Sequence, residues 1–208
     1  NTTAAAAVMN ASAKNTYTGI TTISATGAAT GSATIAVWHL ADGGVASGIG
    51  AASSAAANLV FGTNTANNQG GVLQWQGYTN QSTDRLFTIG LGTAAGRINA
   101  SGTVVGLTTP AVTFSNTGDF AFSGSGTRSF ILGGTTISDN TFRPRITDGT
   151  GGATTLVKAD AGMWVLDPAA GNTYTGGTSI TGGTLAILAG NVLGTGTVTI
   201  NGASGTGL

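Results

Sequence analysis

The stretch that decides the fold is "TGGTSITGGTLAIL", which runs from Thr175 to Leu188. Its Thr-Gly-Gly-Thr unit returns after six residues, and each copy leads into a short apolar segment. Glycine pairs favour tight turns, and short apolar runs that alternate with threonine favour strands. A turn and a strand repeated this closely indicate a coiled ladder, in which each turn of the chain stacks on the one before.

A second repeat spans most of the chain. The pentapeptide "NTYTG" occurs at Asn15–Gly19 and again, 157 residues later, at Asn172–Gly176. Around it, "VMNASAKNTYTGITTIS" from Val8 aligns without a gap with "VLDPAAGNTYTGGTSIT" from Val165. Because the two copies share apolar positions and turn residues, we interpret this as a repeat of architecture, in which residues 1–30 resemble residues 158–187.

The composition of the 208 residues narrows the fold class. Only 7% of them are charged, against roughly 25% in ordinary soluble domains, and there is no Glu. Glycine accounts for 36 residues and helix-favouring residues are scarce, so an all-β chain is expected. The mean hydropathy of +0.24 argues against disorder.

Charge and cysteine content exclude several function classes. The formal net charge is zero, so a nucleic-acid or anionic-membrane partner, which would need a clustered basic surface, is not expected. No apolar run has the length of a membrane span, so we expect no membrane insertion by this segment. The absence of cysteine rules out disulfides and thiolate metal sites. The start "NTTAAAAVMN" lacks a basic leader, and we interpret the chain as a mature or excised piece.

Short apolar runs separated by Gly, Asn, Asp and Ser continue along the whole chain. We predict a parallel β-solenoid that forms a single elongated module over residues 1–208, with a β-sandwich as the alternative. At an assumed 20 to 25 residues per turn, roughly 8 to 10 turns would give a rod on the order of 40 to 50 Å. The segment Ser53 to Asn58 is left open between a short helix and a tight loop.

These stretches resemble the autotransporter-associated β-strand repeats of large bacterial surface proteins. The resemblance is densest in "KADAGMWVLDPAAGNTYTGGTSITGGTLAIL", from Lys158 to Leu188, and extends to "GIGAASSAAANLVF", from Gly48 to Phe61. It implies an exported, right-handed parallel β-helix that serves as a stalk, adhesin or scaffold at the bacterial cell surface. The usual Lys-x-Gly-Ala-Gly-Thr-Trp approach to a strand reads here as Lys158 to Trp164, and in the N-terminal copy it has decayed over residues 1–7.

We expect no catalytic, metal or cofactor site. His39 is the only histidine and no nucleophile motif accompanies it, so it is interpreted as a partly buried residue beside Trp38. The pair Asp84-Arg85 is interpreted as a surface or corner ion pair. The single "DGTGGAT" has the wrong order for a calcium nonapeptide.

Two groups of residues keep other functions open. Asp119, Asp139 and Asp148, with Arg143, Arg145 and Lys158, would form a polysaccharide lyase or hydrolase groove if neighbouring turns brought them together, although turn chemistry is favoured for these aspartates. Trp38, Trp75, Trp164 and Tyr78 would form a sugar-stacking platform if they were exposed, although packing is favoured for these aromatic residues.

The function expected from the sequence is therefore structural and non-enzymatic. Neither end shows a cap, so the strand edges, including Val198–Ile200, are expected to stack head to tail on other copies or on further repeats of a longer chain. A glycan-binding adhesin and a β-helix polysaccharide enzyme are the alternatives.

Overall fold

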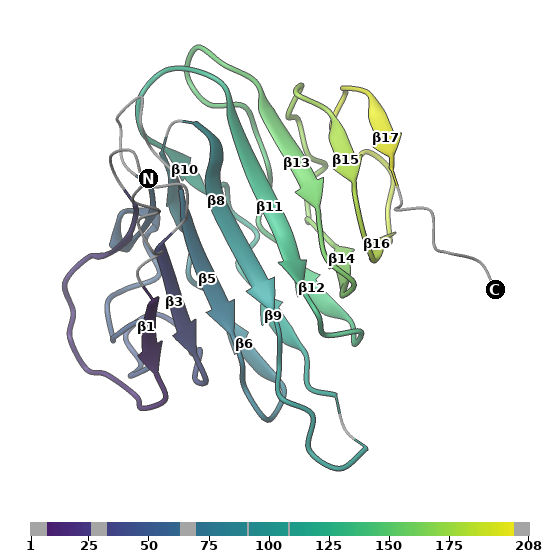
Figure 1. Ribbon diagram of the computed structural model, residues 1–208. Coiled ribbons are helices and arrows are strands. Elements are labelled where there is room, and N and C mark those ends of the chain that lie inside the picture. Colours follow the sequence, from purple (N-terminus) through teal and green to yellow (C-terminus); the bar gives the residue numbers. More distant parts are fainter. Residues whose placement is uncertain (1–7, 26–32, 63–69, 91, 108, 202–208) are drawn as a thin grey trace, which may run out of the picture.

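A computed structural model describes residues 8–25, 33–62, 70–90, 92–107 and 109–201, and these form a parallel β-helix (Figure 1). The strands fall into three sheets, and every pair of named strands is parallel. This confirms the predicted solenoid. The β-sandwich alternative is wrong, because the sheets are built from successive turns of the chain and contain no antiparallel strand pairs.

The longest sheet has eight strands, here called the long sheet. In spatial order they are β1 (Val8–Ala11), β3 (Ala33–Val37), β5 (Gly71–Trp75), β8 (Gly92–Ala100), β11 (Arg128–Gly134), β13 (Thr154–Lys158), β15 (Thr178–Ile180) and β17 (Val198–Ile200). Spatial order follows chain order, so each turn adds one strand above the last.

The two shorter sheets cover different parts of the chain. The five-stranded sheet contains β6 (Gln81–Thr83), β9 (Val112–Phe114), β12 (Asn140–Phe142), β14 (Met163–Leu166) and β16 (Thr184–Ile187). The four-stranded sheet contains β2 (Thr21–Ile23), β4 (Leu59–Phe61), β7 (Thr88–Ile89) and β10 (Ala121–Phe122). In the middle of the chain, each turn visits the long, five-stranded and four-stranded sheets in that order.

The turns differ in length because loops project between the strands. One turn of the long sheet takes the chain from residue 178 to 198, whereas another takes it from residue 34 to 72. Turns near the C-terminal end match the assumed length, and the longer ones exceed it. Within one long turn, Ala56–Asn58 form a short 3₁₀ helix, so residues 53–58 contain a short helix in their second half and a loop in their first. No helix among the described residues is long and apolar enough to cross a bilayer.

The quoted Thr-Gly-Gly-Thr units are corners, as the sequence predicted. Gly177 precedes β15 and Gly183 precedes β16, and both have positive φ angles, 83° and 64°. A Cβ at Gly183 would lie 2.2 Å from the carbonyl oxygen of Gly162 in the previous turn. Only glycine combines this backbone conformation with so close a neighbour. The decayed motif over residues 1–7 lies outside the described residues.

One inward-facing column of the long sheet forms the spine of the core. Its members are register partners in successive turns: Met9, Ile35, Leu73, Ile98, Leu132, Lys158, Ile180 and Ile200. Stacked strands lie about 4.8 Å apart, so each side chain packs on its own counterparts above and below. The column is apolar at every position except Lys158.

Phenylalanines fill the centre of the helix. Phe87 is fully buried and its ring centroid lies 5.3 Å from that of Phe61, 4.8 Å from Phe120, 5.4 Å from Phe130 and 6.2 Å from Phe142. These rings come from five separate segments of the chain. Ring contacts in this cluster therefore hold together turns that are far apart in the sequence.

Replacement of Phe87 by alanine is expected to destabilise the fold strongly. The substitution leaves a cavity among four rings, and such changes cost about 3 to 5 kcal/mol in the free energy of unfolding. Denaturant unfolding followed by circular dichroism measures the change. Tyr78→Ala is the control, because Tyr78 is 50% exposed. Equal unfolding midpoints for the two variants would contradict the central role of Phe87.

Candidate functional site

Lys158 is the most unusual residue of the core. Its side chain is fully buried, between register partners Leu132 and Ile180 in the apolar column. The methylene stem can continue that column, because a lysine side chain packs like an aliphatic one up to its ammonium group. The buried ammonium group then needs hydrogen-bond acceptors inside the protein.

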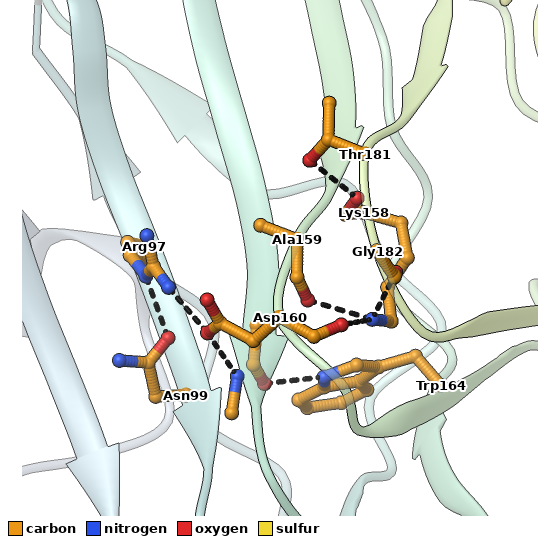
Figure 2. Close-up of polar contacts among 10 residues, drawn as sticks. Arg97, Asn99, Lys158, Ala159, Asp160, Trp164, Thr181 and Gly182 are labelled. Atoms are coloured by element: carbon orange, nitrogen blue, oxygen red, sulfur yellow. Dashed lines mark hydrogen bonds and ion pairs between the residues drawn. The ribbon is translucent and has the colours of Figure 1, made fainter. Parts of the chain in front are cut away.

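Backbone carbonyls provide those acceptors. Lys158 Nζ donates to the carbonyl oxygens of Ala159 at 2.6 Å, Asp160 at 2.9 Å and Gly182 at 2.9 Å (Figure 2). The first two lie in the corner between β13 and β14, and Gly182 lies in the corresponding corner one turn later. All three protons of the ammonium group are thus used. Burial lowers the pKa of Lys158, and Asp160 partly opposes this effect.

Asp160 holds the outer side of the same corner. Its backbone is left-handed, with φ at 59°, and its Oδ2 accepts a hydrogen bond from the amide of Gly134 at 2.7 Å. The same oxygen forms an ion pair with Arg97, whose Nε donates to Asn99 Oδ1 at 2.6 Å (Figure 2). Burial raises the pKa of Asp160, but the Gly134 amide and the charges of Arg97 and Lys158 outweigh it, so the pKa lies below its usual value.

Glycine at position 133 makes this ion pair possible. Arg97 lies on β8 and Asp160 follows β13, so the pair passes over the intervening strand β11. A Cβ at Gly133 would lie 2.6 Å from the Asp160 carboxylate and 2.8 Å from the Arg97 guanidinium. The carbonyl oxygen of Gly133 also accepts a hydrogen bond from the indole of buried Trp164 at 2.9 Å. The contacts of Lys158, Asp160 and Trp164 therefore connect four successive turns, those of β8, β11, β13 and β15. We call this group of contacts the four-turn corner.

The two "NTYTG" copies build the same corner. The amide nitrogens of Asn15 and Asn172 donate to Ser47 at 2.8 Å and Asn191 at 2.9 Å in the following turn. In both copies the tyrosine hydroxyl bonds the threonine four residues later, in the pairs Tyr17–Thr21 and Tyr174–Thr178. Those threonines in turn donate to carbonyls of the next turn, those of Ile49 and Leu193. The pentapeptide is thus a corner that the following turn completes.

The copies differ in their place on the helix. In the N-terminal copy, β1 lies in the long sheet and β2 in the four-stranded sheet. In the C-terminal copy, the equivalent strands β14 and β15 lie in the five-stranded and long sheets. The same corner is therefore displaced by one face. Its environment differs too, because Tyr174 is fully buried whereas Tyr17 is 40% exposed.

Two buried asparagines hold corners by bridging three turns. Asn172 Oδ1 accepts from the amide of Ile146 at 2.8 Å, and its Nδ2 donates to the carbonyl of Val192 at 2.6 Å. Asn140 does the same between Val112 at 3.1 Å and Met163 at 2.8 Å. The sequence reasoning missed Asn140. An available signal was the tripeptide Asn-Thr-aromatic, which occurs at residues 15–17, 140–142 and 172–174.

Asp119 and Asp148 of the candidate groove each have partners of their own. Asp119 forms an ion pair with Arg145 at 3.7 Å, and Arg143 pairs instead with Asp167 at 3.1 Å. Asp148 Oδ1 accepts from the Thr154 amide at 2.7 Å, and its Oδ2 accepts from the Thr175 hydroxyl at 2.7 Å.

Each of these groups therefore has a turn or surface role. Burial raises the pKa of Asp148, but the hydrogen bonds outweigh it, and the pKa is below its usual value. Asp139 is exposed in a loop, and Lys158 is committed to carbonyls. In the described part of the chain, no three His, Cys, Asp or Glu side chains lie close enough together to hold a metal ion.

The packing role favoured for the tryptophans is confirmed, and the sugar-stacking alternative is wrong for the set of four. Trp75 and Trp164 are fully buried, so neither can stack on a sugar, and Trp38 is half-buried. The indole of Trp75 donates to Gln81 Oε1 at 3.0 Å. Only Tyr78 of the four is well exposed. His39 is half-buried next to Trp38, as predicted.

The expected Asp84–Arg85 ion pair is also wrong. Successive residues of an extended chain point to opposite sides, and Arg85 points inward, where it is 1% exposed. Its Nη2 donates to the carbonyl of Gly50 at 3.0 Å, while Asp84 Oδ1 accepts from the amide of Gly43 at 2.7 Å. Burial lowers the pKa of Arg85.

Comparison with known proteins agrees with this architecture. The passenger-associated transport repeat matches residues 11–25 and 156–187, which contain both "NTYTG" corners. The chain carries passenger-associated transport repeats. It is also similar to the adhesin BmaC autotransporter of Brucella suis biovar 1 (strain 1330), with 40% identity over 154 residues. That alignment covers 74% of this chain but only 4% of the relative. No solved structure matches.

These matches confirm the resemblance seen in the sequence. The segment 156–187 contains Lys158, Asp160 and Trp164 of the four-turn corner, whereas Arg97 and Gly133 lie outside the matched residues. Both matched segments are thus of the passenger-repeat type. The predicted extracellular place of this chain at the bacterial cell surface is confirmed, because the repeat is passenger-associated and the relative is an autotransporter.

Replacement of Lys158 by methionine is expected to lower the free energy of unfolding by about 1 to 3 kcal/mol. Methionine keeps the stem in the apolar column but leaves three partly buried carbonyl oxygens without their donor. Chemical denaturation of the purified chain measures the effect. Lys14→Met is the control, because Lys14 is exposed. If Lys158→Met unfolds at the same denaturant concentration as the wild type, the ammonium group does not hold the corner.

Alkaline pH is expected to weaken the corner that contains Tyr174. Burial raises the pKa of Tyr174 to about 12, although its bond to Thr178 opposes the shift, whereas the unfolded chain titrates near 10. The stability contributed by the neutral phenol is complete below pH 10 and is lost as pH rises toward 12, by up to about 2 to 3 kcal/mol.

Tyr174→Phe should remove this alkaline loss, and Tyr17→Phe should leave it unchanged. Unfolding free energies measured below pH 10 and again toward pH 12 separate the two variants. An identical alkaline profile for Tyr174→Phe and the wild type would show that Tyr174 is not the group that titrates.

Proposed function

We propose that this chain is a rigid, non-catalytic segment of a long surface passenger, in which residues 1–208 form one solenoid unit that stacks on further repeats. The observation that carries the proposal is the open column at β17. Val198 is 44% exposed and Ile200 is 73% exposed, although their register partners in the inner turns, such as Leu156 and Leu132, are fully buried. A further turn stacked on β17 would bury these two side chains.

The backbone of β17 supports the same conclusion. Among the described residues, β17 pairs only with β15. The Asn201 amide donates to Ile180 at 2.8 Å and the Thr197 carbonyl accepts from Thr178 at 2.9 Å, so alternate residues face β15. The backbone groups of Val198 and Ile200 therefore face the other side of the strand. A strand edge of this kind pairs readily with another strand.

The length of the relative favours further repeats as the covering partner. The region similar to this chain is 4% of the adhesin BmaC autotransporter. A head-to-tail contact between separate copies uses the same edges and would produce filaments, because a heterologous contact that does not close continues indefinitely. A glycan-binding role is the second candidate, and it is supported by the relative's name as an adhesin.

The way in which the polar groups are used supports a non-enzymatic role. The Lys158 ammonium group, the Asp160 carboxylate and the Asp148 carboxylate are all engaged by the backbone or by neighbouring side chains. A catalytic acid or base needs a free position toward a substrate. These groups instead satisfy the corners of the helix.

Head-to-tail stacking between copies is tested with Ile200→Pro. Proline removes the backbone donor on the open side of β17 and leaves the Asn201 bond to β15 in place. Sedimentation velocity over a range of concentrations should show association of the wild type and none for Ile200→Pro, with Ile200→Val as the control. If Ile200→Pro formed fibres or oligomers as readily as the wild type, stacking through the open edge of β17 would be wrong. A wild type that stays monomeric at all concentrations would restrict stacking to repeats of one chain.

A further inference from the structure

Loops at one corner of the helix lie side by side in three successive turns. They join the long sheet to the five-stranded sheet, between β5 and β6, between β8 and β9, and between β11 and β12. Hydrogen bonds link their bases: the Thr103 amide donates to the Gly77 carbonyl at 2.9 Å, and the Gly102 amide donates to Thr136 Oγ1 at 2.8 Å. The loop that follows β8 extends beyond its neighbours (Figure 1).

The tips of these loops are apolar and exposed. Val104 is 57% exposed, Val105 is 55% exposed and Leu107 is completely exposed. The flanking loops add Tyr78, which is 50% exposed, and Ile137, which is 70% exposed. We call these five residues the apolar ridge. Large apolar side chains gathered on a surface mark a site of interaction.

The surroundings of the ridge carry almost no charge. No charged residue occurs from Ile98 to Gly118, and Asp139 is the only one in the two flanking loops, residues 76–80 and 135–139. An acidic or basic partner would therefore find no complementary group. A partner would therefore bind the ridge mainly through the burial of apolar surface.

We infer that the apolar ridge inserts into the interfacial region of a lipid bilayer with neutral headgroups. The inference rests on the proposed function, because it requires the segment to be displayed outside the cell. A projecting side chain such as Leu107 cannot enclose a small ligand. It is buried only if it enters a lipid bilayer or a pocket of another protein. Leu107 and the two valines are suited to the acyl boundary, and Tyr78 is suited to the headgroup level, where amphipathic aromatic rings gather.

The size of the ridge favours lipid over a second copy of the chain. A stable protein interface uses roughly 20 to 30 residues a side and is anchored by buried aromatic or arginine side chains. The ridge has five side chains, and Tyr78 is the only one of these anchor types among them. Interfacial insertion has no such minimum, because each apolar side chain that enters the bilayer contributes on its own.

This docking differs from membrane spanning. The expectation that the segment does not insert rested on the lack of an apolar run of spanning length. A loop tip that reaches only the acyl boundary needs no span, and its backbone groups stay within the hydrated headgroup layer. Binding by so few residues should be weak, reversible and independent of salt, like anchoring by a single acyl chain.

Cosedimentation of the chain with phosphatidylcholine vesicles tests the inference. The wild type should partition onto the vesicles, and Leu107→Asp combined with Val105→Asp should reduce the partition coefficient by about tenfold or more. Val45→Asp is the matched control, because Val45 is 53% exposed in another loop and should behave as the wild type does. All three positions are exposed, and circular dichroism checks that each variant keeps the fold.

Three results would overturn it. The wild type could fail to bind phosphatidylcholine, the ridge variant could bind as well as Val45→Asp, or binding could require anionic lipid and fall with salt. Loss of self-association in the ridge variant, without vesicle binding by the wild type, would assign the ridge to a second copy instead. Ile200→Pro separates this inference from strand stacking, because it should bind vesicles normally even where it no longer assembles.

Discussion

Backbone groups at the corners of a β-helix have no strand to pair with, and the rest of this structure depends on how they are satisfied. Along the flat faces, each turn pairs with the turns above and below it. At the corners, buried amide and carbonyl groups would be left without partners, at a cost of about 1 to 3 kcal/mol each. Side chains supply the missing partners here. Asn140 and Asn172 each bridge a preceding and a following turn, and Lys158 joins three carbonyls from two turns.

The stacking of successive turns explains why the chain has few charged residues. Register partners stack directly on each other, about 4.8 Å apart. Like charges on two such partners would repel each other strongly, so a charged residue needs neutral partners above and below it. The charged residues of the long sheet have neutral register partners. Lys158 lies between two apolar neighbours, and the Arg97–Asp160 pair passes over a glycine. Charges of this kind connect successive turns.

Much of the fold follows from local sequence. Glycine pairs fix the corners, alternation fixes the strands, and the repeat of Asn, Tyr and Thr fixes the contacts within each "NTYTG" corner. The side-chain roles were harder to predict. Whether Trp75 and Trp164 are exposed, and whether Arg85 points outward, depends on the register of each strand, and a shift of one residue moves a side chain to the other face. Asn140 was missed because its partners lie in the turns before and after it, far away in the sequence.

The sequence by itself determined that the chain coils, where it turns, and that residues 15–19 and 172–176 make the same corner. Only the tertiary structure decided the face on which each copy lies. The corner is specified by contacts within a few residues and with the next turn, so it forms wherever the chain presents it. Its face depends on the summed length of all the loops between the copies, and turns as different as those from 34 to 72 and from 178 to 198 displace it by one face. Loop length carries little energetic preference of its own, so packing against neighbouring turns sets the final position.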